Sequence, residues 1–322
     1  MIKIIAELCQ NHNGDFKILR KMVESVSRAG ATHIKIQNIY ADNLTLRPQF
    51  ENGLIKNKIQ KSIKRPYKTE YLRLKKLELK NKEIKRFISL ANEYGLVPIT
   101  TCFSRDNILE IKKQGFKSVK VASYDCASFQ MLRELKENFQ DIIISTGATY
   151  DHEISLAAKI MKNHSYSFLH CITIYPTPLN QLNLHRMNWL KKFTKNIGFS
   201  DHTLVEKYDI KASKIALAMG AKIIERHFTI LEKDKTKDGP VSINEQQLAE
   251  LVYFSKLKRS EQMNEINSWK ININKIMGKK IRNLSHQEIL NRDYYRGRFA
   301  SKRLNKKNPE NMIYNWEEIK IK

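Results

Sequence analysis

Short apolar runs alternate with longer amphipathic stretches along most of the chain. The runs have the length and β-branched content of strands, and the stretches between them repeat apolar residues every three or four positions, as helices do. We expect strands at residues 2–8, 33–37, 96–101, 118–122, 141–145, 167–171, 196–200 and 222–227. We expect helices at residues 16–29, 81–94, 105–114, 128–137, 152–162 and 206–219.

Strands and helices in this alternation are typical of a closed (β/α)8 barrel, so the expected fold class is α/β, a TIM barrel with a short C-terminal appendage. An open doubly wound sheet is the alternative, but no Gly-x-Gly-x-x-Gly loop follows the first strand. Segment 40–80 is too long for an ordinary loop, and we expect it to cover the site. Residues 1–262 are expected to form the barrel domain, and residues 263–322 a C-terminal extension.

Composition narrows the class of protein. The 322 residues are 41% hydrophobic, which suffices for one large core, and no apolar run is long enough to cross a membrane. The chain begins directly with a strand, without the pattern of a secretory signal, so we expect a cytoplasmic protein with no membrane partner. Cys9, Cys102, Cys126 and Cys171 lack paired spacing, which indicates reduced thiols without a disulfide framework or zinc knuckle.

The formal net charge of +25 raises the question of a nucleic-acid partner. Lysine is abundant throughout the chain, and no basic stripe is interleaved with aromatic residues as a stacking platform requires. We therefore expect no nucleic-acid partner. A basic surface would still attract anionic substrates.

The ends of the expected strands are strongly polar. In a (β/α)8 barrel the chemistry gathers at the C-terminal ends of the strands. The polar residues there are Glu7, Lys35, Gln37, Thr101, Lys120, Ser123, Asp125, Thr173, Tyr175, Ser200, His202, Glu225 and His227. This set predicts a functional site at that face of the barrel.

Two lysines, Lys35 and Lys120, interrupt apolar strands. Buried ammonium groups require an anionic partner. One interpretation pairs them with Glu7 or Asp125. In the other interpretation, the two ammonium groups and nearby hydroxyls bind a phosphate and a carboxylate. Phosphoenolpyruvate carries both of these groups. A Schiff-base lysine is a rival use of the same residues.

His202 and His227 each stand where a short apolar strand ends. A single histidine in such a place is more often a hydrogen-bonded core residue than a ligand. Two imidazoles from two strand ends form a candidate metal site, in which a divalent ion would polarise an aldehyde as a Lewis acid. Imidazole ligands suit manganese, iron, cobalt or zinc better than magnesium alone.

Several blocks of sequence carry a resemblance to a known family. They are residues 5–14, 29–37, 100–104, 120–123, 145–147, 170–171 with 175–177, 198–203 and 225–229, in the order of the family. With them the chain resembles the sialic acid synthases, meaning the N-acetylneuraminate, legionaminate and pseudaminate synthases. The resemblance implies a (β/α)8 barrel that condenses phosphoenolpyruvate with the open-chain aldehyde of an N-acyl hexosamine, such as N-acetylmannosamine. The products would be a nine-carbon 2-keto acid and phosphate, with C–O cleavage.

The resemblance also assigns roles to positions. The expected catalytic residues are Glu7, Lys120, Asp125 and Glu225. Asp125 and Glu225 are both candidates to deliver the water, and the sequence leaves that choice open. The expected substrate contacts are Lys35, Gln37, Thr101, Ser123, Thr173, Tyr175, Ser200 and Asp238. His202 and His227 are the expected metal ligands, with manganese as the expected ion and magnesium or cobalt as alternatives.

The chain departs from the family pattern at three places. Thr173 stands where many members have Asn or Ser. Residues 237–242 replace the usual Gly-Pro-Asp-His, and Asp238 is expected to substitute for the absent aspartate. Residues 296–302 resemble the start of an antifreeze-like domain, which would be reduced or truncated here. A homodimer is implied by the resemblance alone.

Two other functions stay open. One is a related phosphoenolpyruvate-dependent ulosonic acid synthase that acts on a phosphorylated sugar, with Arg65 and Lys68 as candidate phosphate contacts. The other is an inactive barrel, or a basic binding protein, that keeps the fold without turnover.

Overall fold

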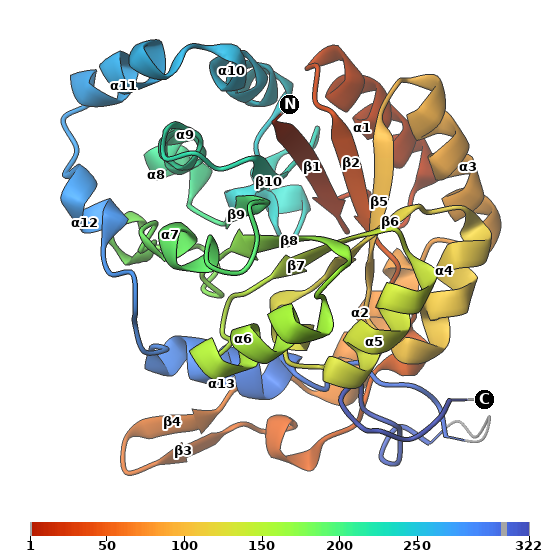
Figure 1. Cartoon of the computed structure of the whole chain (residues 1–322). Coiled ribbons are helices and arrows are strands. Elements are labelled where there is room, and N and C mark those ends of the chain that lie inside the picture. The colour runs from red at the N-terminus through yellow and green to blue at the C-terminus, as the bar shows by residue number, and fades with distance from the viewer. Residues whose placement is uncertain (1, 304–307, 322) are drawn as a thin grey trace.

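The computed structural model describes residues 2–303 and 308–321, and its centre is a closed barrel of parallel strands (Figure 1). The barrel strands are β1 (Lys3–Cys9), β2 (His33–Gln37), β5 (Val97–Cys102), β6 (Ser118–Val121), β7 (Asp141–Ser145), β8 (Ser165–His170), β9 (Ile197–Asp201) and β10 (Ile223–His227). Their order around the barrel is β1-β10-β9-β8-β7-β6-β5-β2, and β2 pairs again with β1. This closure confirms the expected (β/α)8 class and excludes the open sheet.

Helices follow the strands and cover the outside of the barrel (Figure 1). They are α1 (Phe16–Arg28), α3 (Asn81–Glu93), α4 (Ile108–Gln114), α5 (Phe129–Asn138), α6 (Asp151–Ile160), α7 (Arg186–Leu190), α8 (Val205–Tyr208), α9 (Lys211–Ala218) and α10 (Glu245–Lys256). The expected helix at 206–219 is broken into α8 and α9, because Asp209 adopts a left-handed φ of 49° between them. No helix was expected at α7, since five residues are too few to show a helical period.

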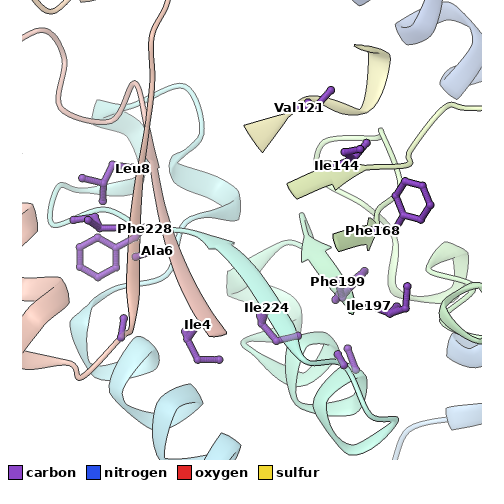
Figure 2. Packing of buried hydrophobic residues seen from close by; sticks show 14 of the residues in the cluster. Ile4, Ala6, Leu8, Val121, Ile144, Phe168, Ile197, Phe199, Ile224 and Phe228 are labelled. Atoms are coloured by element: carbon purple, nitrogen blue, oxygen red, sulfur yellow. The ribbon is translucent and has the colours of Figure 1, made fainter. Parts of the chain in front are cut away.

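An apolar core fills the space between the barrel and its helices (Figure 2). Ile4, Ala6 and Leu8 alternate along β1 and belong to this core, as do Ile197 and Phe199 on β9. Successive side chains of a strand point to opposite faces. The positions between these residues therefore face the barrel interior.

The barrel interior changes from apolar to polar along the strands. Its apolar part is a separate buried cluster of Ile5, Ile99, Ile143, Leu169 and Ile223. Two positions further along the same strands, or directly after them, are Glu7, Thr101, Ser145, Cys171 and Glu225. Because the strand period is two, these side chains share the interior but lie nearer the C-terminal ends. This mostly polar layer carries the candidate site.

Segment 40–80 forms an antiparallel hairpin of β3 (Leu54–Lys56) and β4 (Ile59–Ser62), followed by α2 (Tyr67–Leu77). After α10 the chain adds α11 (Arg259–Ser268), α12 (Ile273–Met277) and α13 (His286–Tyr295). The 3-10 turns are η1 (Ala41–Asn43), η2 (Pro48–Phe50), η3 (Arg105–Asn107), η4 (Ser123–Asp125), η5 (Leu179–Gln181), η6 (Lys233–Lys235) and η7 (Gly239–Val241). The predicted helix at 105–114 therefore begins as η3 and continues as α4.

The C-terminal part of the chain folds back onto segment 40–80. Leu44 pairs with Phe299, and the rings of Phe50 and Tyr294 meet edge to face with centroids 5.2 Å apart. Figure 1 shows the hairpin, α13 and the chain's end together at one end of the barrel. These elements therefore surround the ends of several strands, as expected for segment 40–80.

The predicted boundary at residue 262 stays a prediction. Lys214 of α9 pairs with Glu250 of α10 at 2.6 Å and with Glu265 of α11 at 2.5 Å, so both sides of that boundary pack on one helix. The resemblance of residues 296–302 to an antifreeze-like domain also stays a prediction. In the described ranges, no helix is both long and apolar enough to cross a membrane.

Candidate active site

Lys35 lies inside the barrel on β2, where it forms an ion pair with Glu7 of β1. Its Nζ donates to Oγ1 of Thr101 at 3.0 Å and lies 3.8 Å from Oε2 of Glu225. Burial lowers the pKa of Lys35 to about 8, although the charge of Glu225 opposes the shift. The pairing with Glu7, one of the two interpretations drawn from the sequence, is present in the structure.

Lys120 lies on β6 with only 3% of its surface exposed. Its Nζ donates to Oγ of Ser145 at 2.6 Å and to the carbonyl oxygen of Val121 at 3.1 Å. Within the described part of the chain, the carboxylate in ion-pair range is that of Glu225, at 4.0 Å. Asp125 is not its partner. A buried ammonium group that has mainly neutral partners favours the binding of an additional anion.

Glu225 of β10 lies between the two lysines. Its Oε1 accepts a hydrogen bond of 2.8 Å from Oγ of Ser200, and its Oε2 has no hydrogen-bond partner among the described residues. Burial acts to raise the pKa of Glu225, but the charges of Lys120 and Lys35 outweigh burial and lower it. Glu225 is therefore ionised, and one of its oxygens is available to a substrate or water.

His202 and His227 follow or end neighbouring strands β9 and β10, and their ring centroids are 5.3 Å apart. Both rings are buried, and each Nδ1 lacks a hydrogen-bond partner in the described ranges. Burial lowers the pKa of both residues, which favours the neutral form that binds metals. Their Nδ1 atoms are thus not used in hydrogen bonds to the described residues, unlike those of a typical core histidine.

A tighter group of donor atoms surrounds His227. Its donor atom and those of Cys9 and Asp238 all lie within 4.8 Å of one another. Oδ2 of Asp238 is 2.8 Å from Sγ of Cys9 and 4.0 Å from Nδ1 of His227. Asp238, expected from the sequence as a sugar contact, thus lies beside the metal-ligand candidates, and His202 is outside this close group.

An ion pair behind the histidines supports their position. Arg226 and Asp201, the residues next to His227 and His202, are fully buried and lie 2.5 Å apart on the outer face of the barrel. Asp201 also accepts from Oγ1 of Thr203 at 2.8 Å. Because both partners are desolvated, removal of one would leave an unpaired buried charge. The pair therefore fixes the relative position of the two strand ends.

The remaining expected substrate contacts lie around the same mouth. Ser123 lies 3.0 Å from Sγ of Cys171, and the buried Oγ1 of Thr173 has no hydrogen-bond partner in the described residues. Tyr175 is 45% exposed, and its ring centroid is 4.4 Å from that of His202. Gln37 ends β2 opposite Thr101 in the register with β5. These side chains offer polar and aromatic contacts beside the lysines and histidines.

Asp125 stands apart from the two lysines. Its Oδ1 accepts hydrogen bonds from Oγ of Ser128 at 2.8 Å and from Nδ2 of Asn315 at 3.0 Å. Burial raises the pKa of Asp125 to about 6, although these two hydrogen bonds oppose the shift. The residue therefore connects the end of β6 to the C-terminal part of the chain.

Asp125→Asn is expected to flatten the dependence of stability on pH. Because the folded-state pKa is raised, Asp125 stabilises the fold when protonated, and this contribution falls as the pH rises from about 4 to about 6. Without this carboxyl group, the free energy of unfolding should change less with pH, by up to about 1.4 kcal/mol per pH unit in this range. Urea unfolding between these pH values measures the slope. Asp234→Asn, which removes an exposed carboxylate, should leave it unchanged, and an unchanged slope in Asp125→Asn would contradict the assignment.

Sequence reasoning missed two residues of the site. Cys9 was interpreted only as a reduced thiol, because no cysteine spacing suggested a ligand. It meets Asp238 only because barrel closure pairs β1 with β10. Asn315 was missed because it lies 190 residues from Asp125, in a part of the chain without a periodic pattern. Cys9 had one usable signal, its position directly after a predicted strand.

The closed (β/α)8 barrel carries buried lysines, carboxylates and imidazoles at its strand ends. Enzymes with this fold have their active sites at that face. The chain belongs to the NeuB family, whose model matches residues 22–282. It is 32% identical to an N,N'-diacetyllegionaminic acid synthase of Campylobacter jejuni over 251 residues, which cover 74% of this chain and 69% of the relative. It is 28% identical to a mouse N-acetylneuraminate-9-phosphate synthase over 260 residues, which cover 77% of this chain and 68% of the relative.

Among solved structures, the chain is similar to an N-acetylneuraminic acid synthetase from Leptospira borgpetersenii, crystallised with citrate. The identity is 26%, the TM-score is 0.68, and the match covers 90% of each chain. The matches to curated relatives span 64–69% of those proteins' lengths. The family resemblance drawn from the sequence is thereby confirmed.

Proposed function

We propose that the chain condenses phosphoenolpyruvate with the open-chain aldehyde of an N-acyl hexosamine, producing a nine-carbon 2-keto acid and phosphate. The observation that carries this proposal is the state of Lys120, a buried ammonium group that donates to a hydroxyl and a carbonyl. Near it are two buried imidazoles whose Nδ1 atoms have no hydrogen-bond partner among the described residues. Family membership and the synthase names of the relatives support the same reaction.

The lysines would bind the anionic groups of phosphoenolpyruvate. Lys35 and Lys120 both lie within 4.0 Å of Glu225, so two cations face a single small volume of the barrel. Hydroxyls of Thr101, Ser123 and Ser200 lie on neighbouring strand ends and would complete the phosphate and carboxylate contacts. Cations fixed in advance stabilise the charge that develops on the departing phosphate.

The imidazoles would hold a divalent metal ion, for which manganese is our proposal. The Nδ1 atoms of His202 and His227 have no hydrogen-bond partner within residues 2–303 and 308–321. With the carboxylate of Asp238 near His227, they form a donor set suited to manganese, iron, cobalt or zinc. When bound, such an ion supplies Lewis-acid polarisation of the sugar aldehyde. The residues present fit this group.

The chain's residues would then act as follows. Lys35 and Lys120 orient phosphoenolpyruvate so that its C3 faces the aldehyde carbon. The C2–C3 π pair forms the C–C bond, and the carbonyl π pair moves to the aldehyde oxygen, which takes a proton from water. Water adds at C2, the C2–O bond to phosphate breaks, and the bridging oxygen leaves with phosphate. Glu225 is the better placed of the two candidates to receive the proton of this water, because it is ionised and its Oε2 has no hydrogen-bond partner in the described ranges. Asp125 is held by Ser128 and Asn315 instead.

The acceptor sugar would lie above this layer. Tyr175, Thr173 and Gln37 surround the mouth, and the exposed ring of Tyr175 can cover a sugar face. Glu7, whose carboxylate pairs with Lys35, would hold that lysine in place as well as contact the sugar. Helix α13 adds Asn291, whose Nδ2 donates to the carbonyl oxygen of Thr173 at 2.6 Å.

A second candidate function is favoured by a basic cluster at the rim. Arg73 and Arg298 lie 3.1 Å and 2.8 Å from Glu70, and Lys237 is close enough for its charge to interact with all three. Arg73 also donates to Oε1 of Gln10, directly after β1. A net positive rim beside the site suits an acceptor that carries a phosphate. Arg65 contributes to the same field, as considered from the sequence.

We expect phosphate release from phosphoenolpyruvate with manganese and unphosphorylated N-acyl hexosamines, measured across a panel that includes their 6-phosphates. Preference for a 6-phosphate, lost in Arg73→Ala but kept in the surface variant Arg133→Ala, would establish the second candidate. Absence of release with every sugar, in protein shown to be folded, would favour the inactive barrel and contradict both synthase proposals.

A further inference from the structure

Cys9 belongs to the closest group of metal-binding donors in the described ranges. Its Sγ donates to Oδ2 of Asp238 at 2.8 Å, and the same carboxylate oxygen lies 4.0 Å from Nδ1 of His227. Cys9 and His227 are 5% and 7% exposed, so their side chains have little access to bulk water as a hydrogen-bond partner. The Nδ1 of His227 has no hydrogen-bond partner within the described residues. A buried thiol, a buried imidazole and a partly exposed carboxylate thus converge.

The backbone holds this thiol in an unfavourable conformation. Cys9 has a left-handed φ of 49°, which costs free energy for any residue except glycine. The register between β1 and β2 shifts between Glu7 and Cys9, and the Cys9 N–H donates to Oε1 of Glu7 at 2.6 Å. Strain of this kind is commonly found at functional sites. Glycine would relieve this cost, so Cys9→Gly is compatible with the backbone at this position.

The donor separations fit a small metal ion. Tetrahedral ligands at the usual zinc bond lengths lie roughly 3.3–3.8 Å apart. The separations of 2.8 Å and 4.0 Å bracket this range, and no pair in the group exceeds 4.8 Å. Modest side-chain rotation therefore suffices to place one ion among the three atoms. Thiolate ligands favour zinc and cobalt over manganese and magnesium.

We propose that Cys9, His227 and Asp238 together bind a divalent metal through a thiolate, an imidazole nitrogen and a carboxylate oxygen, and that this site selects zinc or cobalt over manganese. As the sulfur–metal bond forms, the Cys9 thiol loses its proton to solvent, and Asp238 exchanges the S–H donor for the ion. The inference rests on the proposed function only in placing a metal at His227. It adds a thiolate to the donors His227 and Asp238 already considered, and it predicts tighter binding of zinc or cobalt than of the manganese proposed for turnover.

Cobalt titration of the metal-free full chain under reducing conditions tests the proposal. We expect an intense sulfur-to-cobalt charge-transfer band in the near ultraviolet, together with visible bands of a four-coordinate ion. Cys9→Gly should lack the charge-transfer band while keeping the fold, because glycine accepts the φ of this position. Cys9→Ser, which keeps the side-chain size, should lack it too. Cys126→Ala, at a buried cysteine in the core outside the barrel, should keep it.

Competition between metals gives a second readout. Zinc should displace manganese from the parent, and the ratio of the two affinities should fall at least about 10-fold in Cys9→Gly. A parent without the band, or a band that survives in Cys9→Gly, would overturn the inference. A parent that releases phosphate with a metal but shows no band overturns the inference alone. A band in a parent that releases no phosphate with any sugar overturns the proposed function and leaves the thiolate site standing.

Discussion

Lys120→Met is expected to lower kcat/KM for phosphoenolpyruvate by about 10- to 150-fold, mainly through a higher KM. Methionine fills a similar volume but removes the charge that would pair with the phosphate or carboxylate. In the structure Lys120 contacts Ser145 and the Val121 carbonyl, and its distance to Glu225 is 4.0 Å. A charge with so little neutralisation is available to a substrate. Steady-state assays of phosphate release at varied phosphoenolpyruvate measure the effect.

The stability of this variant separates substrate binding from a structural role. Because a buried ammonium group is costly to desolvate, Lys120→Met should melt within a few degrees of the parent. Lys113→Ala, which removes an exposed lysine of α4, controls for the loss of one positive charge. If Lys120→Met kept the parent's KM and kcat, the proposal that Lys120 binds an anionic group of phosphoenolpyruvate would be wrong.

His227→Ala is expected to lose the response to metal and about 1000-fold in rate, because a Lewis acid is worth several kcal/mol in such a reaction. The parent should lose activity when treated with a chelator and regain it with added manganese. His227→Ala should not regain it at the metal concentration that restores the parent. Phosphate release after chelation and metal titration measures both.

The matched control is His152→Ala, which removes an exposed histidine at the start of α6. It should respond to chelator and metal as the parent does. Because the ring of His227 lies beside Asp238 and His202, its removal also tests the whole metal-ligand group. A His227→Ala variant restored by manganese like the parent would show that the ion, if one is used, binds elsewhere.

Much of the fold could be predicted because each barrel strand is a short apolar run between helices with one apolar face. The strand ends shifted by one or two residues, as in β8, which spans Ser165–His170 and was expected at 167–171. Hydrophobicity does not mark where the ladder of hydrogen bonds ends. The break between α8 and α9 was not predictable, since the left-handed φ of Asp209 has no signal in the residue pattern.

The site was predictable where a residue type conflicts with its surroundings. Lys35 and Lys120 stand out because charged side chains are rare within buried strands, and the structure buries both. Contacts that depend on closure of the barrel were not predictable. Cys9 and Asp238 are 229 residues apart and meet only because β1 pairs with β10. The single sequence likewise could not show that Glu225, and not Asp125, would lie between the two lysines.

The most direct test of the central claim follows the bridging oxygen of phosphoenolpyruvate. Substrate labelled with heavy oxygen between C2 and phosphorus is incubated with the full chain, manganese and the N-acyl hexosamine that supports turnover. The proposed reaction predicts labelled phosphate and an unlabelled nine-carbon 2-keto acid in equal amounts, because the C2–O bond breaks and water supplies the new oxygen. Unlabelled phosphate, or phosphate released without the keto acid, would contradict a condensation carried out by Lys35, Lys120 and Glu225 at the mouth of this barrel.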